Sequence, residues 1–171
     1  SEDRRSFLDL MISSTDSLHK KRLSAYKKYK NERIKILKSR NHINDNRWLD
    51  VVEKKMSEVG IMLCDSRRVF LNSLNKSYKQ IDDQVPSLTM SLNGILDKNL
   101  EKTPALYVEE YFQETLRNNR IKDSISGRTS LSANKTDLLV FDAKTNQEAK
   151  SFSTGEQKII IISIIFSFLN L

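Results

Sequence analysis

Residues 46–82 read NRWLDVVEKKMSEVGIMLCDSRRVFLNSLNKSYKQID, and this stretch decides the expected fold. Its apolar side chains recur at steps of three, four or seven residues: Trp48, Val52, Met56, Val59, Leu63, Phe70, Leu74 and Ile81. A stripe this narrow is typical of one long helix with a coiled-coil-like seam. At 1.5 Å per residue the helix would be roughly 55 Å long, which exceeds most globular helices.

A second helix is expected directly before it, over residues 16–40, with a thin apolar stripe between basic positions. The Asn-Asp-Asn cluster within residues 41–46 indicates a turn between the two helices. Long helices joined by a short polar turn pack antiparallel, each covering the stripe of the other. We therefore expect a helical arm, a coiled-coil-like hairpin, over residues 15–82, and a connecting helix within residues 1–14.

The pattern changes after Val85-Pro86, where residues 87–93 alternate between polar and apolar in strand period. Thr103-Pro104 is a good helix start, and the helix should run to about Arg120. Two short strands are expected around 128–133 and 137–142. The last helix follows Gly155 and is apolar on every face over 159–171, which is too short to span a bilayer and indicates a buried helix. The expected fold class is α+β, mainly helical.

The charge of the chain is concentrated in one segment. The 171 residues carry 29 Lys and Arg against 22 Asp and Glu, a net charge of +7. Residues 19–40 hold a single acid, Glu32, and ten of these cations: Lys20, Lys21, Arg22, Lys27, Lys28, Lys30, Arg33, Lys35, Lys38 and Arg40. These cations could neutralise DNA phosphates independently of sequence. The alternative is a solvated outer face of the arm, although such a face usually mixes both signs of charge.

The remaining composition narrows the class of protein. Cys64 is the only cysteine, which excludes an internal disulfide and fits a reducing cytoplasm. Its apolar neighbours predict a buried small hydrophobe. The first residues lack the shape of a signal peptide. His19 and His42 stand alone, without the clustered ligands that a metal site needs. We expect a cytoplasmic protein without a membrane span.

The stretch of sequence that can carry chemistry is Ser153-Thr154-Gly155-Glu156-Gln157-Lys158, which lies where the last helix begins. Free amides and the positive end of a helix dipole make such a corner a natural anion site. Gly155 lets a ligand approach the backbone closely. The structural alternative is a plain N-cap, in which Ser153 or Thr154 caps the helix and Glu156 complements its dipole.

These six residues, followed by an apolar helix, resemble the signature motif of the RecF branch of the ABC-type ATPases. Further segments resemble RecF in the same order along the chain: residues 1–9, Ser24 to Lys27 with Arg33, Trp48-Leu49-Asp50, 127–130 and 135–139. The resemblance implies that residues 83–171 are part of an ABC-ATPase head, with short strands and the signature helix, attached to the helical arm.

The resemblance also implies a function. Ser153 and the backbone of Gly155 would contact the γ-phosphate of an ATP, bound with magnesium by a RecF-type partner subunit, with Gln157 and Lys158 nearby. The ten cations of residues 19–40 would contribute to a groove for single- or double-stranded DNA. Recombination mediators would be further partners, in recombinational repair and the SOS response.

Other elements of the family are missing. No G-x-x-x-x-G-K-[ST] phosphate loop occurs. The strand ending at Asp142 precedes the signature, whereas the magnesium-binding strand of the family follows it, and Ala143 stands where a catalytic Glu would. Residues 132–135 replace a Gly-Pro-His-Arg-like element. We therefore expect a chain truncated at both ends that hydrolyses nothing alone. The alternatives are a non-enzymatic helical interaction module, or an inactive gene remnant whose exposed residues 159–171 promote aggregation.

Overall fold

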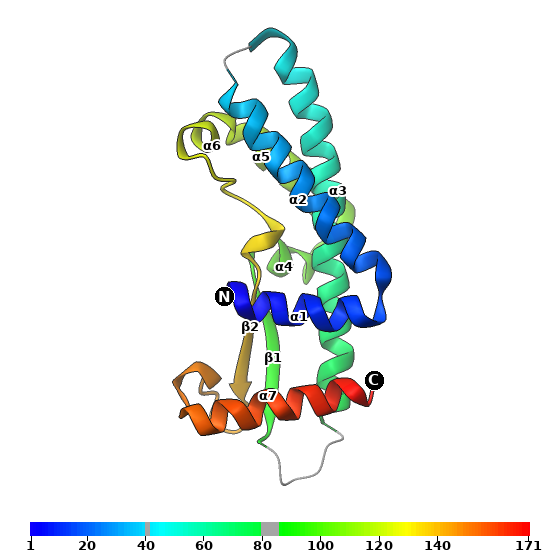
Figure 1. The fold of residues 1–171 in the computed structure, drawn as a ribbon, viewed down its shortest axis with the longest axis vertical. Coiled ribbons are helices and arrows are strands. Elements are labelled where there is room, and N and C mark those ends of the chain that lie inside the picture. The colour runs from blue at the N-terminus through cyan, green and yellow to red at the C-terminus, as the bar shows by residue number, and fades with distance from the viewer. Residues whose placement is uncertain (40–41, 80–85) are drawn as a thin grey trace.

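The computed structural model describes residues 1–39, 42–79 and 86–171; within residues 42–45 only the backbone is described. Helices predominate over a single pair of strands (Figure 1). The elements, in chain order, are α1 (Glu2–Thr15), α2 (Ser17–Lys38), α3 (His42–Tyr78), β1 (Leu88–Asn93), α4 (Ile95–Leu100), α5 (Ala105–Asn118), α6 (Arg120–Ser126), the 3-10 turn η1 (Ala133–Lys135), β2 (Asp137–Asp142), the 3-10 turn η2 (Ala149–Ser151) and α7 (Thr154–Leu169).

The long helix and its antiparallel partner form as the apolar stripe predicts. Helix α3 spans 37 residues and lies beside α2, and Val52, Met56, Leu63 and Leu74 of the seam are buried. Trp48 is not buried in the seam. The residue is 52% exposed, and its indole nitrogen donates to Glu32 Oε1 at 3.1 Å. Ile81 lies outside the described residues.

The turn expected over 41–46 is wrong for most of its length, because α3 already begins at His42. Asn and Asp are as common at helix starts as in turns, since their side chains hydrogen-bond nearby backbone groups in both settings. The polar cluster therefore marks the entry into the helix. The helix expected within residues 1–14 forms as α1. Its role as a connection between head and arm stays a prediction.

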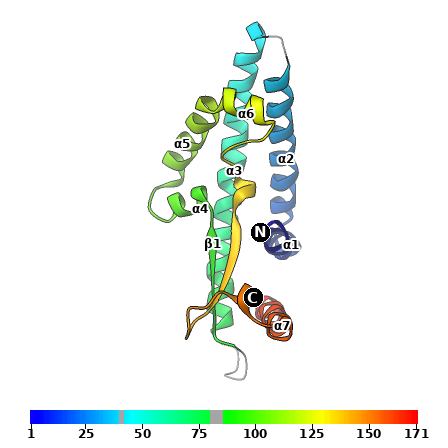
Figure 2. The same ribbon diagram turned by 90° about the vertical axis from the view of Figure 1, so that its left-hand side faces the viewer.

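Helices α2 and α5 flank α3 on different sides (Figure 2). The close approach requires the glycine at position 60, because a Cβ built there would lie 2.8 Å from Phe112 Cε1 and 2.9 Å from Tyr26 Cε2. Both aromatic side chains belong to a buried cluster formed by α2, α3, α4, α5 and the segment before β2. Cys64 is buried in the same cluster, as predicted, and burial raises the pKa of its thiol.

The sheet consists of β1 and β2, which pair antiparallel from Leu88↔Asp142 to Asn93↔Asp137. The alternation predicted for residues 87–93 is confirmed, since Leu88, Met90 and Leu92 are buried. The side chain of Asn75 on α3 extends the hydrogen bonding of β1 by donating to Met90 O at 2.8 Å and accepting from Met90 N at 3.0 Å.

The strand expected around residues 128–133 does not form, so this prediction is wrong. Backbone groups of this segment bond to side chains instead of a neighbouring strand. Ser130 N donates to Asp123 Oδ1 at 2.9 Å, and Ala133 N donates to the hydroxyl of Tyr26 at 2.9 Å. The serine and threonine residues that suggested a strand therefore belong to an anchored loop.

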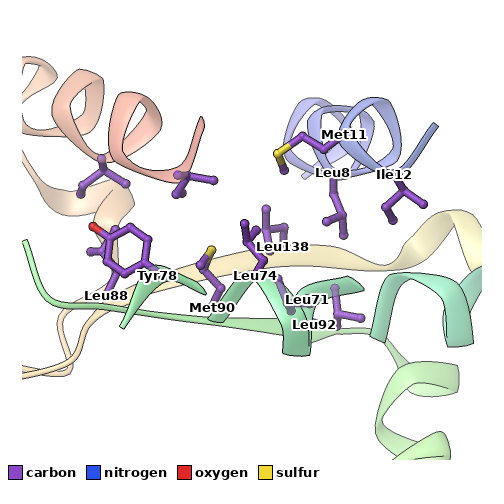
Figure 3. Close-up of a cluster of buried hydrophobic side chains, with 12 residues drawn as sticks. Leu8, Met11, Ile12, Leu71, Leu74, Tyr78, Leu88, Met90, Leu92 and Leu138 are labelled. Carbon is purple, nitrogen blue, oxygen red and sulfur yellow. The ribbon is translucent and has the colours of Figure 1, made fainter. Parts of the chain in front are cut away.

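A second buried cluster lies around the sheet (Figure 3). Side chains of α1 and α7 face side chains of the sheet and of the C-terminal half of α3. Leu8, Leu74 and Leu138 are among its most buried members. Helix α3 thus contributes to both clusters, and α5 and α6, which follow residue 83, pack on α3 and α2. The division into arm (15–82) and head (83–171) stays a prediction, and packing crosses it.

Helix α7 is buried on one side only, which corrects the prediction of a fully buried helix. Ile160, Ser163, Ile164 and Ser167 face the interior. Seven other apolar side chains of residues 159–171 are between 39% and 69% exposed: Ile159, Ile161, Ile162, Ile165, Phe166, Leu169 and Leu171. Phe168 is partly buried and packs against the cluster around the sheet. No helix in the described residues is long and apolar enough to cross a membrane.

Two fully buried arginines, Arg33 and Arg67, connect distant parts of the chain. Arg67 donates to both carboxylate oxygens of Asp9 at 2.8 and 2.9 Å, and to Ala133 O at 2.7 Å. His19 Nε2 lies 2.9 Å from Asp9 Oδ1. Burial raises the pKa of Asp9, but the hydrogen bonds from His19 and Arg67 outweigh it and hold that pKa below its ordinary value. Arg67 therefore ties α1, α3 and the segment before β2 together.

Candidate functional site

The signature-like corner forms the start of α7 and is fixed by local hydrogen bonds. Ser153 Oγ accepts from Glu156 N at 3.3 Å, and the Glu156 carboxylate accepts from Ser153 N at 2.8 Å and from Ser153 Oγ at 2.6 Å. These contacts make a complete capping box. The N-cap, the structural alternative expected from the sequence, is therefore present. A capping box leaves the other amides of the first turn available, so it does not exclude an anion at the same corner.

The corner faces outward. Ser153, Thr154, Gly155, Glu156 and Lys158 are all exposed, and a Cβ built at Gly155 would meet nothing within 4 Å. The amides of Thr154 and Gly155 lie in the first turn of α7, where no intrahelical acceptor exists. Neither amide has a hydrogen-bond acceptor among the residues that the structure describes. Two backbone donors and the positive end of a 16-residue helix are therefore open to an anion.

Two side chains of the corner are already engaged. The amide nitrogen of Gln157 donates to Phe152 O at 2.9 Å and to Lys150 O at 3.1 Å, which directs it toward the preceding turn. The hydroxyl and amide of Ser153 hold the pKa of Glu156 below its ordinary value. Glu156 is therefore charged at neutral pH, and it would have to release Ser153 before the serine hydroxyl could donate to a phosphate.

The end of β2 is built as a turn and not as a magnesium ligand. Asp142 Oδ1 accepts from Thr145 N at 2.7 Å, from Lys144 N at 2.9 Å and from Thr145 Oγ1 at 3.0 Å. The backbone amide of Thr145 contributes most to holding the pKa of Asp142 below its ordinary value. No group of three or more His, Cys, Asp and Glu side chains that could hold a metal occurs in the described residues. The described residues thus leave two backbone donors open at the start of α7 and hold no such metal-binding cluster.

Most cations of residues 19–40 lie on the outer side of α2. Lys20, Lys21, Lys27, Lys28, Lys35 and Lys38 are exposed, and Lys30 is half-buried. None of these seven lysines has an ion pair with a described residue. Arg22 is half-buried, donates to Ser66 Oγ at 3.1 Å and lies 3.6 Å from Asp16. Arg40 lies outside the described residues.

Arg33 corrects the sequence-based set of DNA-binding residues. Its side chain is 0% exposed and donates to Glu53 Oε1 at 2.9 Å, to Asp123 Oδ2 at 2.7 Å and to Leu116 O at 2.6 Å. A guanidinium with these partners cannot reach a phosphate outside the molecule. Arg33 instead joins α2 to α3, α5 and α6, a role that sequence reasoning missed.

The comparisons with known proteins agree with this architecture. No family model matches the chain. Curated relatives called DNA replication and repair protein RecF match 99% of the chain: those of Rickettsia typhi and Rickettsia prowazekii are 35% identical, and that of Rickettsia felis is also 35% identical. The chain spans 46% of each of these proteins, so it corresponds to about half their length.

Solved structures of RecF share the fold. The structure of the recombination mediator protein RecF-ATPrS in the RecFOR pathway matches 99% of this chain with a TM-score of 0.84 at 19% sequence identity, and the RecF-ATP structure of the same pathway matches 98% with a TM-score of 0.83 at 20% identity. The chain covers 46% and 45% of those chains. In sequence and in fold, the chain belongs to the RecF family and corresponds to about half of a RecF protein.

Proposed function

We propose that this chain acts in DNA replication and repair as one side of a nucleotide-dependent RecF-type assembly. Its part is to close over the triphosphate of an ATP that a partner subunit binds. The observation that carries this proposal is the outward-facing corner at the start of α7, with the amides of Thr154 and Gly155 open. The relatives matched over 99% of the chain are named as DNA replication and repair proteins, and the matched structures are named as RecF with ATP or ATPrS.

The chemistry of the corner is that of recognition and not of hydrolysis. Backbone donors at a helix N-terminus stabilise the charge of a terminal phosphate without forming or breaking a bond. The described residues contain neither the lysine-bearing phosphate loop nor a magnesium site, so phosphoryl transfer would need groups from another subunit. Magnesium, when bound there, would neutralise the β- and γ-phosphate oxygens. The chain alone should therefore show no ATPase activity.

The exposed lysines of α2 support DNA as the second ligand. Six lysines without acidic partners in the described residues present a positive surface that a polyanion can neutralise. Such binding would be independent of sequence and sensitive to salt, and it would suit single- and double-stranded DNA. The same proposal includes recombination mediators as partners, a role in the SOS response and a cytoplasmic location. It is supported by the similarity to the RecF structure of the RecFOR pathway.

The exposed side of α7 favours a second candidate, a helical module that binds a protein partner without nucleotide. Its apolar residues would pack against that partner, and the capping box would be only structural. An inactive gene remnant would leave the same surface bare, and its isolated chain would aggregate. The candidates differ in whether ATP controls the association.

The deciding experiment measures the association of the 171-residue chain with a full-length RecF subunit, by size-exclusion chromatography with light scattering. We expect association with a non-hydrolysed ATP analogue and magnesium, and little with ADP. Ser153→Asp should abolish it, because Asp still caps the helix but repels the γ-phosphate. Ser153→Arg should abolish it sterically as well.

The matched control is Ser73→Arg, an exposed serine on α3 that lies far along the chain from the corner. It should leave the nucleotide-dependent association unchanged. Association that is equally strong without nucleotide, and unaffected by Ser153→Asp, would replace the proposal by the interaction module. Aggregation of the chain with no association under any condition would favour the gene remnant.

A further inference from the structure

A basic pocket lies between α2 and the loop that precedes β2, away from the signature corner. It has a volume of about 590 Å³. Five cations line it, three from α2 and two from the loop: Lys30, Lys35, Lys38, Arg128 and Lys135. The lining contains no acidic residue. Like charges gathered in a concave surface repel one another, so the arrangement favours a bound anion.

Most of these cations are free to bind a ligand. Within the described residues, Lys30, Lys35, Lys38 and Arg128 have neither an ion pair nor a side-chain hydrogen bond. Lys135 Nζ donates to Ser130 O at 2.6 Å, which holds it across the loop. Lys38 extends over Gly127, where an added Cβ would lie 2.9 Å from its Nζ. Gly127 has a φ of 65°, a conformation that favours glycine, so it makes room for that ammonium group.

The loop side of the pocket is rigidly held. Asp123 Oδ1 accepts from Ser130 N, and its other oxygen is paired with the buried Arg33 at 2.7 Å. The hydroxyl of Tyr26 lies 3.0 Å from Ser132 Oγ and accepts from Ala133 N. Arg67 donates to Ala133 O at 2.7 Å. Binding would therefore cost little ordering of the backbone, as in other preorganised sites.

One residue that lines the pocket has a polar group without a partner. Thr129 lines the pocket and is 7% exposed, and its hydroxyl has no hydrogen-bond partner in the described part of the chain. Buried hydroxyls are nearly always hydrogen-bonded, so an unpaired one beside several cations fits the recognition of an oxygen-rich ligand. Phosphate oxygens accept from a threonine hydroxyl and from ammonium and guanidinium groups alike.

The surroundings of the pocket point to a polynucleotide phosphate. Lys21, Lys28 and Lys35 follow one another at intervals of seven residues, so they lie on one side of α2 roughly 10 Å apart. This row leads along the helix into the pocket. A free phosphate would need only the pocket, whereas a strand can use the pocket and the row together.

We propose that this pocket seats a backbone phosphate of a nucleic acid strand that continues along the lysine row of α2. The inference rests on the proposed DNA binding and adds to it one fixed contact formed by the loop, with Thr129 and Arg128 as binding residues that the basic segment of the sequence does not include. The pocket takes a phosphate group by its charge and its donors, and it reads no base.

The test compares two pairs of exposed lysines on the same helix. Lys35→Ala with Lys38→Ala removes two cations of the pocket, and Lys20→Ala with Lys27→Ala removes two exposed cations outside both the pocket and the row. Binding of a labelled DNA duplex and of a labelled single strand to the 171-residue chain is followed by fluorescence anisotropy over a range of salt. The pocket pair should weaken binding about tenfold and lower the salt slope by about one to two, and the control pair should cost about threefold or less.

Thr129→Val tests the unpaired hydroxyl separately. The side chains have the same shape, and the hydroxyl has no partner to lose, so the thermal unfolding midpoint should stay the same or rise. DNA affinity should fall by about threefold or more. A lower midpoint with unchanged affinity would mean that the hydroxyl is structural, and it would overturn this part of the proposal.

The outcomes separate the pocket from DNA binding in general. Equal losses from both lysine pairs would overturn the pocket and leave α2 as a diffuse DNA-binding surface. No loss from either pair would overturn both. A pocket-dependent signal with ADP alone, and none with DNA, would identify a free nucleotide as the source of the phosphate and overturn the polynucleotide form of the inference.

Discussion

The two regions of this molecule differ in how their charged and apolar side chains are distributed. The arm-side region consists of α2, the N-terminal half of α3, α4, α5, α6 and residues 127–135, and it pairs buried charges around Arg33. The sheet-side region consists of α1, the sheet, α7 and the C-terminal half of α3, and it leaves one side of α7 apolar and exposed. The first region holds the buried guanidinium of Arg33 in a network of its own, with Glu53 and Asp123 as partners. The second offers a surface for something else to cover.

The largest expected effect tests the charge centre of the arm-side region. Arg33→Met should lower the free energy of unfolding by about 3–5 kcal/mol, because Asp123 would keep a buried charge without its cation. Denaturation with urea measures this loss. Lys35→Ala, two residues away on the exposed side of α2, should change it by no more than about 0.5 kcal/mol. Similar values for both variants would mean that the two sides of α2 do not differ.

The next effect separates the two sides of α7. Ile164→Ala should cost about 2–4 kcal/mol, because Ile164 is packed in the sheet-side cluster. Ile162→Ala should cost about 0.5 kcal/mol or less, because 53% of Ile162 is exposed. Both values come from the same unfolding measurement. A large loss for Ile162 would show that the outer side of α7 is already covered, for instance by a second copy of the chain.

A smaller effect concerns the glycine beside Lys38. Gly127→Ala should destabilise the chain by about 1–2 kcal/mol, because an alanine at a φ of 65° is strained and its Cβ would displace the Lys38 ammonium. Gly155→Ala is the control, since its Cβ would meet nothing and alanine favours the helix. Thermal unfolding should rank Gly155→Ala at or above the wild type. The reverse ranking would contradict the assigned backbone conformation.

The smallest effect is the pH dependence of the exposed cap of α7. The pKa of Glu156 is held below its ordinary value of 4.5, so its stabilising contribution is present above that pH and is lost as the pH falls through the folded-state pKa. The unfolding midpoint measured between pH 3 and 6 should therefore fall more at low pH for the wild type than for Glu156→Gln. Parallel curves would show that the capping box contributes nothing.

The features that sequence patterns predicted are those determined by near neighbours. The seam of α3, the alternation of β1 and the start of α7 each depend on residues within a few positions of one another. The role of Arg33 depends on Asp123, which is 90 residues away, and on Glu53, which is 20 residues away. One local signal existed, because Arg33 is seven residues from the buried Tyr26 and so lies on the same side of α2.

Two other differences between the sequence-based predictions and the structure also arise from contacts with distant parts of the chain. Residues 128–133 contain strand-forming side chains, but Asp123 and Tyr26 bind the backbone that a strand would have used. Helix α7 has apolar residues all round, a pattern typical of a buried helix, and only one side of it is covered by the described residues. Periodicity reports how apolar a side chain is, whereas coverage depends on which other elements are present.

Helix α3 is one continuous, stiff helix that links the two ends of the molecule. Near its C-terminal end it is joined to α7, where Ser77 Oγ donates to Ser167 O at 2.9 Å and Ser167 Oγ donates to Leu74 O at 3.3 Å. Its other end reaches the tip of the hairpin (Figure 1). Over a length of roughly 55 Å, a tilt of about 10° imposed at one end would displace the other by roughly 10 Å. A rotation too small to disturb the packing around α7 would thus be a large movement for anything held at the far tip.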